Sequence, residues 1–177
     1  MIWRLAAAAD TLRKQVDTRY PKRDKGSDGT VGDQAHRRRV SDHNPDKAGF
    51  VMALDLDEDG WPAHVFADQL IAYMRASGDQ RIKNIVYENR VASGTYKNVK
   101  GDTPTWWVWR PAFGMGHEHH IHVSFNASAR DDARPFPIPI LLNASPTQTH
   151  GNDSLDAPAG TLVPAKRTRK KATPKPP

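Results

Sequence analysis

Two stretches of the chain carry apolar residues at helical spacing. In residues 2–16 they form a stripe among strong helix formers, and Pro21 follows. The second stretch starts near Pro62, which suits the first turn of a helix, and runs to about Arg75 before Gly78. We predict an amphipathic helix in each, the first of which covers a sheet. The stripe of the first helix consists of Leu5, Ala8, Ala9, Leu12 and Val16.

Four other stretches have the alternation or the composition of β-strands. Residues 50–57 alternate between an apolar face and a face with two carboxylates. Residues 120–125 alternate between polar and apolar positions. Residues 82–87 are apolar enough for a strand, and residues 105–110 are rich in tryptophan. The charged, glycine-containing residues 22–32 lack any period, so we predict a surface loop there.

Histidine is concentrated in the stretch from Gly116 to Ser124, which holds four of the eight histidines within six positions. On a strand, side chains two residues apart point to the same face, so His120 and His122 would lie side by side. Imidazole is the commonest transition-metal ligand in proteins and the usual acid–base group near neutral pH. This cluster therefore predicts a metal or catalytic site rather than a solvated polar strand face.

The composition restricts the chemistry of such a site. The 177 residues include no cysteine, which excludes disulfides and thiolate zinc sites and leaves His and carboxylate as ligands. A hydrophobic fraction of 37% and five tryptophans suffice for a packed core. The length predicts one domain, or one domain with a tail.

The positive charge is unevenly distributed. Residues 143–177 hold six Lys and Arg against two Asp, whereas residues 1–142 hold 20 against 18. After a short apolar run at residues 138–142, the composition predicts a disordered, Pro-rich basic tail or linker over residues 143–177. Nucleic-acid binding through the tail and Arg37–Arg39 is a less favoured interpretation, because the rest of the chain has little excess charge.

The N-terminal apolar run is too short for a transmembrane segment, and Asp10 interrupts it too early for a signal peptide. We therefore expect synthesis in the cytoplasm without a signal peptide, so that any action outside the cell needs a separate means of release.

Three further residues are candidates for the chemistry. Asp55 lies inside a predicted strand, where a carboxylate calls for a cationic partner, whereas Asp57 suits a turn. Arg39 stands nearest to Ser41-Asp42-His43 and could clamp a substrate carboxylate, although three consecutive arginines also suit a solvated surface. Arg110, like the tryptophan before it, could line a groove.

A three-ligand zinc site with one open position could be built from His43, Asp55 and one of the pair His120 and His122. Zinc lowers the pKa of its bound water toward about 7, and a second, unligated base then takes a proton. Two adjacent imidazoles on one strand face can divide these two tasks.

Three short elements carry a resemblance to a known family. They resemble the Ser-x-His, Ala-x-Asp and His-x-His elements of the D-alanyl-D-alanine carboxypeptidase family and its relatives with the lysostaphin and hedgehog fold. These proteins are zinc peptidases that cut peptidoglycan, and the flanking residues are especially similar to bacteriophage endolysin peptidase domains. The resemblance covers about residues 2–126. The elements are Ser41-Asp42-His43, Ala53-Leu54-Asp55 and His120-Ile121-His122.

The resemblance implies an α+β domain with a small antiparallel sheet that carries the zinc site and two or three flanking helices. We place this domain over residues 1–142, because the tail composition begins at residue 143. The resemblance also implies that His43, Asp55 and His122 bind Zn²⁺ and that His120 is the general base or transition-state stabiliser. Glu118 is a second choice for the base, because it shares the strand face of His120 if the strand extends back.

Further roles and departures follow from the same resemblance. His117 resembles an additional active-site histidine of the murein endopeptidase branch. The interval from His43 to Asp55 is longer than in many members, so Asp46 and Asp57 are rival ligands, and His119 stands where many members have an acidic residue. The substrate-binding candidates are Arg39, Ser41, His117 and Arg110.

The implied function is hydrolysis of a peptide bond in bacterial peptidoglycan by a phage endolysin that reaches the cell wall after release by a partner protein. The basic tail could contact the anionic wall. A different interpretation is a non-catalytic zinc module of the same fold that binds the wall or a protein. The bond remains open among L-alanyl-D-glutamate, D-alanyl-diaminopimelate and terminal D-alanyl-D-alanine, and so does the choice between endopeptidase and carboxypeptidase.

Overall fold

The computed structural model describes residues 2–34, 36–94, 106–114 and 116–142. The chain divides into two units, Met1–Pro146 and Thr147–Pro177, and every described residue belongs to the first. The predicted tail from residue 143 onward lies outside the described residues. Within the described part, no helix combines the length and apolar character that crossing a bilayer requires.

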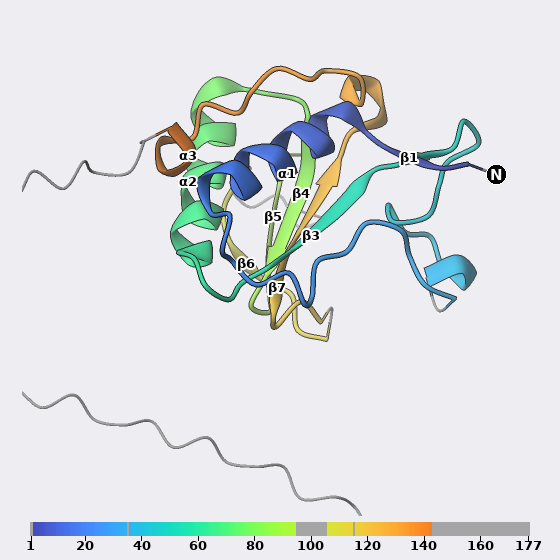
Figure 1. The fold of residues 1–177 in the computed structure, drawn as a ribbon, viewed down its shortest axis with the longest axis horizontal. Coiled ribbons are helices and arrows are strands. Elements are labelled where there is room, and N and C mark those ends of the chain that lie inside the picture. Colours follow the sequence, from blue (N-terminus) through green and yellow to red (C-terminus); the bar gives the residue numbers. More distant parts are fainter. Residues whose placement is uncertain (1, 35, 95–105, 115, 143–177) are drawn as a thin grey trace, which may run out of the picture. The chain divides into compact units, whose positions relative to one another are not determined.

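The described part has an α+β fold (Figure 1). Its main sheet is antiparallel, with five strands in the order β3-β7-β4-β5-β6, and a separate parallel pair joins β1 to β2. The strands are β1 (Arg4–Leu5), β2 (Phe50–Val51), β3 (Ala53–Asp57), β4 (Ile82–Tyr87), β5 (Arg90–Ser93), β6 (Arg110–Pro111) and β7 (His120–Phe125). The helices are α1 (Ala7–Arg19), α2 (Ala63–Ser77), α3 (Pro139–Leu142) and the short 3₁₀ turns η1 (His36–Arg38) and η2 (Ala127–Ala129).

The apolar face of the main sheet packs against the helices. Leu54 and Leu56 of β3 and Ile121 and Val123 of β7 are fully buried there, together with the apolar stripes of α1 and α2. Each buried leucine, isoleucine, valine, phenylalanine or methionine side chain contributes about 1.5–3 kcal/mol through burial. The buried stripe residues are Ala8, Ala9, Leu12 and Val16 of α1 and Ala63, Phe66, Ala67, Leu70, Ile71 and Met74 of α2.

The opposite face of the sheet carries the polar side chains of β3 and β7. Strand register places Asp55 of β3 beside His122 of β7, and the same row continues through Val86 and Val91 to Arg110 of β6. The strands alternate between these two faces, as the period of two requires. Because β7 is inserted between β3 and β4, residues far apart in sequence come together on this polar face.

Several predicted elements differ from the observed ones. The first helix begins at Ala7 rather than at residue 2, because Arg4–Leu5 pairs with Phe50–Val51. The predicted strand over residues 50–57 is divided at Met52, whose N–H donates to the Asp42 carbonyl instead. The helix before Gly78 is confirmed, with Gly78 in the left-handed conformation at its end.

The prediction of a strand over residues 105–110 is wrong for the described residues 106–110. Among these only Arg110 lies in a strand, Trp106 forms an isolated bridge with Ser93, and Trp107 adopts a left-handed backbone (φ 51°) with its ring buried. Strand β5, which the sequence analysis did not predict, pairs with β4 through a tight turn. Glu88 and Asn89 of that turn both have positive φ, at 47° and 57°, which matches a type I′ hairpin.

Candidate metal centre

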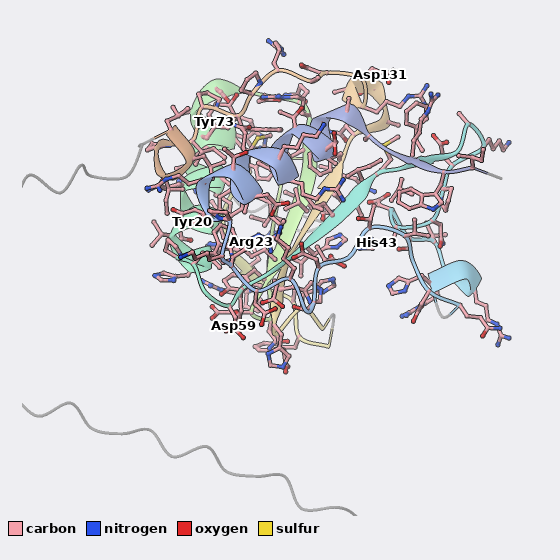
Figure 2. The ribbon with its side chains drawn as sticks, in the orientation of Figure 1. Tyr20, Arg23, His43, Asp59, Tyr73 and Asp131 are labelled. Atoms are coloured by element: carbon pink, nitrogen blue, oxygen red, sulfur yellow. The ribbon has the colours of Figure 1, made fainter. Side chains whose placement is uncertain are left out.

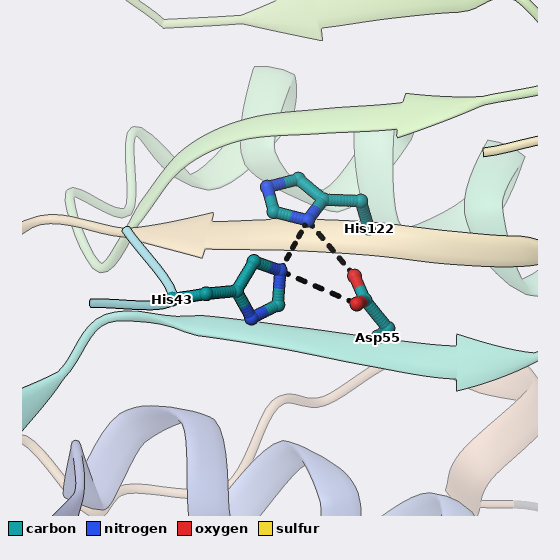
Figure 3. Close-up of side chains that lie close together, drawn as sticks. All are labelled: His43, Asp55 and His122. Atoms are coloured by element: carbon teal, nitrogen blue, oxygen red, sulfur yellow. Dashed lines mark hydrogen bonds and ion pairs between the residues drawn. The ribbon is translucent and has the colours of Figure 1, made fainter. Parts of the chain in front are cut away.

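Three side chains converge on the polar face of the sheet (Figure 3). His43 Nε2 lies 3.1 Å from His122 Nδ1 and 3.3 Å from Asp55 Oδ2, and His122 Nδ1 lies 2.9 Å from Asp55 Oδ1. Their donor atoms all lie close enough together to hold one metal ion. The side chains are 6%, 16% and 12% exposed for His43, Asp55 and His122, so the cluster is largely shielded while retaining a route to solvent.

The distances match the requirements of a tetrahedral site. Ligand bonds of about 2.0–2.1 Å at tetrahedral angles place neighbouring ligand atoms about 3.3 Å apart. The three observed separations, 2.9, 3.1 and 3.3 Å, require movements of only a few tenths of an ångström from that value. His43, Asp55 and His122 therefore form a fitting three-ligand set for a metal ion.

Sheet register and one loop bring the three residues together. Asp55 and His122 are direct cross-strand partners on β3 and β7, so their side chains leave the same face side by side. His43 comes from the loop between η1 and β2. That loop is held at both sides of His43, by the Met52 N–H on the Asp42 carbonyl (2.9 Å) and by the Gly32 N–H on the His43 carbonyl (3.0 Å).

Each of the two imidazoles is oriented by a hydrogen-bond partner at its other ring nitrogen. His43 Nδ1 lies 2.8 Å from the Thr30 carbonyl, which only accepts hydrogen bonds, so Nδ1 carries a proton and Nε2 presents its lone pair to the centre. His122 Nε2 lies 2.9 Å from Ser124 Oγ, a hydroxyl that accepts from Nε2–H when Nδ1 binds a metal. Partners of this kind fix both the tautomer and the direction of metal-binding histidines.

Gly29 leaves room for the Asp55 carboxylate. Gly29 and Asp55 form an antiparallel bridge, and a Cβ added at Gly29 would lie only 2.5 Å from Asp55 Oδ2. Any side chain there would displace the carboxylate. The predicted surface loop at residues 22–32 is thus partly paired with the sheet, and it supplies Gly29 and Thr30 to the metal centre.

The electrostatics favour a cation at the centre. Burial raises the pKa of the Asp55 carboxyl, but the hydrogen bonds and charges of His122 and His43 outweigh burial and hold that pKa well below its usual range. Burial lowers the pKa of His43, yet Asp55, the Thr30 carbonyl and Asp42 raise it above its ordinary value. Asp55 is therefore a carboxylate, and the site attracts positive charge.

Two more histidines flank this centre. His120 lies on β7 two residues before His122, and its Nε2 is 3.7 Å from Asp55 Oδ1. The His117 ring lies edge-on to both neighbours, with centroids 4.9 Å from His120 and 4.8 Å from His122. Burial lowers the pKa of His120, and the charges of His122 and His43 add to this against the raising effect of Asp55. His120 is therefore a neutral imidazole near neutral pH.

A pocket of about 460 Å³ opens beside the metal centre. Its volume is in the range of small-molecule and peptide-end sites, about 300–1,000 Å³. Asn84 contributes a buried side-chain oxygen, Oδ1, that has no hydrogen-bond donor among the described residues. The pocket is lined by His36, Arg39, Val40, Ser41, Asp42, His43, Asn84, Val86, Gly114, His117, His122 and Ser124.

The predicted substrate-binding residues separate into two groups. Arg39, Ser41 and His117 line the pocket, with Arg39 exposed and Ser41 Oγ accepting the His43 N–H at 3.2 Å. Arg110 does not line it. It lies on β6, three strands from β7 and hence about 14 Å away at about 4.8 Å per strand, and its Nη2 donates to Ser93 Oγ.

Glu118 does not share the strand face of His120, because β7 begins at His120. Its exposed carboxylate instead accepts from Asn89 Nδ2 at 3.4 Å, outside the residues that line the pocket. The strand extension on which its role depended is therefore absent, and His120 is the better-placed base of the two.

Neither rival ligand reaches the centre. Asp57 accepts hydrogen bonds from the Ser27 N–H and hydroxyl and from the Asp59 N–H, which makes it a turn-stabilising residue. Asp46 accepts from the Ala48 and Phe50 N–H groups in another turn. Both carboxylates are committed to backbone donors elsewhere.

Four residues that complete the centre were not predicted from the sequence. Gly29 and Thr30 lie in a stretch without periodicity, so no local pattern marked them. Ser124 could have been predicted, because it follows His122 at the strand spacing of two and so shares its face. Asn84 lies directly across from Ser124 on β4, which only the strand order reveals.

Comparison of the chain with protein-family models, with curated proteins and with solved structures finds no match.

Proposed function

We propose that this protein is a zinc-dependent peptidase that hydrolyses a peptide bond in bacterial peptidoglycan, as a phage endolysin does. The observation that carries the proposal is the ligand set of His43, Asp55 and His122 beside a pocket. Three protein ligands leave a fourth position for water or substrate, which distinguishes catalytic zinc sites from closed structural ones.

Zinc is the metal that the donor set favours. Two imidazole nitrogens and one carboxylate oxygen at tetrahedral separations suit Zn²⁺, whereas Mg²⁺ and Ca²⁺ prefer six or more oxygen ligands. When bound, zinc would supply Lewis-acid activation of a water molecule and of the scissile carbonyl.

The remaining residues divide the work of proton transfer and binding. His120, whose Nε2 faces Asp55 at 3.7 Å, would take the proton from the attacking water and return it to the leaving amine. Ser124 and the Thr30 carbonyl hold the ligand imidazoles in place. Asn84 Oδ1 offers an acceptor for a substrate N–H, since a substrate would supply the donor that this buried oxygen lacks among the described residues.

The substrate class rests on the motifs and on the rim of the pocket. The Ser-x-His, Ala-x-Asp and His-x-His elements resemble those of peptidases that cut peptidoglycan. Arg39, exposed at the pocket, is suited to bind a carboxylate of the acidic stem peptide. In this proposal the enzyme acts at the cell wall after release from the host cytoplasm, where the basic tail assists contact with the anionic wall.

The test is digestion of purified muropeptides, followed by mass spectrometry, with and without a chelator. The proposal expects a mass increase of one water and separation of fragments, lost with the chelator and restored by Zn²⁺. The product masses also identify the bond. His64→Ala is the matched control, because His64 is exposed on α2 outside the pocket.

His120→Ala separates catalysis from mere binding. An enzyme with His120 as base keeps zinc and loses hydrolysis by about 10²–10⁴-fold. If wild-type protein binds zinc tightly but leaves every muropeptide intact, the peptidase proposal fails and the protein is a non-catalytic zinc module. If wild-type protein binds no zinc, both functions fail.

A further inference from the structure

A second group of potential ligands adjoins the first. Asp55, His117 and His120 each offer one ligand atom, and these atoms lie within 4.8 Å of one another. Asp55 belongs to both groups. Its Oδ1 lies 2.9 Å from His122 Nδ1 of the first group and 3.7 Å from His120 Nε2 of the second, while its Oδ2 lies 3.3 Å from His43 Nε2, so the carboxylate stands between the two groups.

The backbone brings His117 to this position at a cost. His117 has a left-handed conformation (φ 65°), which is uncommon for a residue other than glycine, and Gly116 before it has φ 76°. The Glu88 N–H donates to the His117 carbonyl at 3.1 Å, which ties the segment to the β4–β5 turn. Backbone strain of this kind is concentrated at functional sites. Here it holds a third imidazole against His120 and His122.

We propose that Asp55, His117 and His120 bind a second divalent transition-metal ion, with the Asp55 carboxylate bridging it to the first. Two imidazoles and a carboxylate select Zn²⁺, Co²⁺, Ni²⁺ or Cu²⁺ over Mg²⁺ and Ca²⁺. Paired metal ions in two-metal sites lie about 3.5–4 Å apart, a distance that one bridging carboxylate can span.

The second ion binds more weakly than the first. Asp55 is the only carboxylate in both groups, so the first ion already neutralises much of the charge that would attract the second. Two cations this close also repel each other. In addition, the 3.7 Å separation of His120 from Asp55 is longer than the separations in the first group, so ligand movement accompanies binding.

Occupancy of the second site is inhibitory, a consequence that rests on the proposed function. A metal ion on His120 Nε2 takes the lone pair with which His120 would accept a proton. The enzyme would thus be active with one ion per chain and suppressed by excess zinc. Binding of the second ion itself does not depend on the peptidase activity.

Metal titration tests the second site directly. Metal-free protein is titrated with Zn²⁺ against a chromophoric chelator, and bound zinc is measured by elemental analysis. Wild-type protein should bind two ions per chain in two steps. His117→Asn should lose the weaker step alone, since asparagine tolerates the left-handed backbone but lacks the imidazole. His119→Ala is the control, because His119 adjoins the site in sequence yet its side chain is 83% exposed.

The outcomes keep the two proposals apart. A single step in wild-type protein, or two unchanged steps in His117→Asn protein whose circular dichroism is native, overturns the second site. Two steps in a protein that cuts no muropeptide leave the second site standing and refute the peptidase. In an active enzyme, the ratio of rates at one equivalent and at excess Zn²⁺ should fall toward one in His117→Asn.

Discussion

Two buried polar clusters in this protein differ in their balance of donors and acceptors. Arg23, whose side chain is fully buried, donates five hydrogen bonds, to Asp17, Asp28 and the Asp24 carbonyl, at 2.6–3.0 Å. His43, which marks the other cluster in Figure 2, faces His122 and Asp55, where lone pairs and a carboxylate converge.

The difference indicates which cluster is structural. All five N–H donors of a guanidinium are satisfied around Arg23, so that cluster is complete as it stands. The His43 cluster is short of positive charge, which a bound cation would supply. Burial alone does not separate the two, because both are shielded. The balance of donors against acceptors does.

Removing a ligand should have the largest effect. His122→Ala leaves two ligands, and because zinc sites of four ligands yield about 10–16 kcal/mol, we expect a loss of about 3 kcal/mol or more in zinc binding. This is at least about a 100-fold weaker affinity. Chelator competition measures it. Unaltered affinity would show that His122 is no ligand.

Breaking the other cluster should affect folding instead. Arg23→Met leaves Asp17 and Asp28 without their cation, and because such losses cost about 3–5 kcal/mol while these carboxylates retain some exposure, we expect about 3 kcal/mol. Urea unfolding of metal-free protein measures the change. Arg23→Lys should lie between, since lysine keeps the charge without the five-donor fork. If folded Arg23→Met protein lost zinc affinity to the same extent as it lost stability, the Arg23 cluster would not be purely structural.

Gly29→Ala should lower zinc affinity by less than the loss of a ligand does. The added Cβ would meet Asp55 Oδ2 at 2.5 Å, so the carboxylate must turn away from His43. We expect zinc affinity to fall about 10–100-fold, the range for a disturbed partner of a ligand. Gly78→Ala is the control at a glycine outside the candidate metal centre, although its left-handed φ of 65° adds strain of its own. Equal zinc affinity in Gly29→Ala and wild type would place Asp55 outside the ligand set.

The ion pair between Arg81 and Asp79 should give the smallest effect, which is a change in the pH dependence of stability. Burial raises the pKa of Asp79, but hydrogen bonds and charge from Arg81 outweigh it, so the folded pKa lies below the usual value. Its stabilising contribution is therefore fully present above the unfolded pKa of about 3.9 and is lost as pH falls through the folded pKa. Urea midpoints of metal-free wild type and Asp79→Asn should converge as the pH is lowered below about 4. A gap that is constant with pH would exclude this linkage.

Local patterns in the sequence predicted much of the fold but few of its pairings. The stripe of α2 and its end at Gly78 follow from periodicity and one glycine, which act within a few residues. The strand prediction for residues 105–110 failed because an aromatic-rich composition also suits a buried turn, as at Trp107. Strand β5 escaped prediction because Glu88 and Asn89 are not the glycine-containing dipeptides that mark a type I′ turn.

The amino-acid composition and the strand alternation limit the chemistry that is available at the centre. Without cysteine, any metal must rest on His and carboxylate, and the alternation after His120 places two imidazoles on one strand face. Tertiary structure decided which groups meet. By residues alone, His120 and His122 were equivalent candidates, and the register with β3 set His122 against Asp55. Gly29 and Thr30 joined the centre through a bridge that no local pattern encodes, because strand pairing depends on contacts between residues distant along the chain.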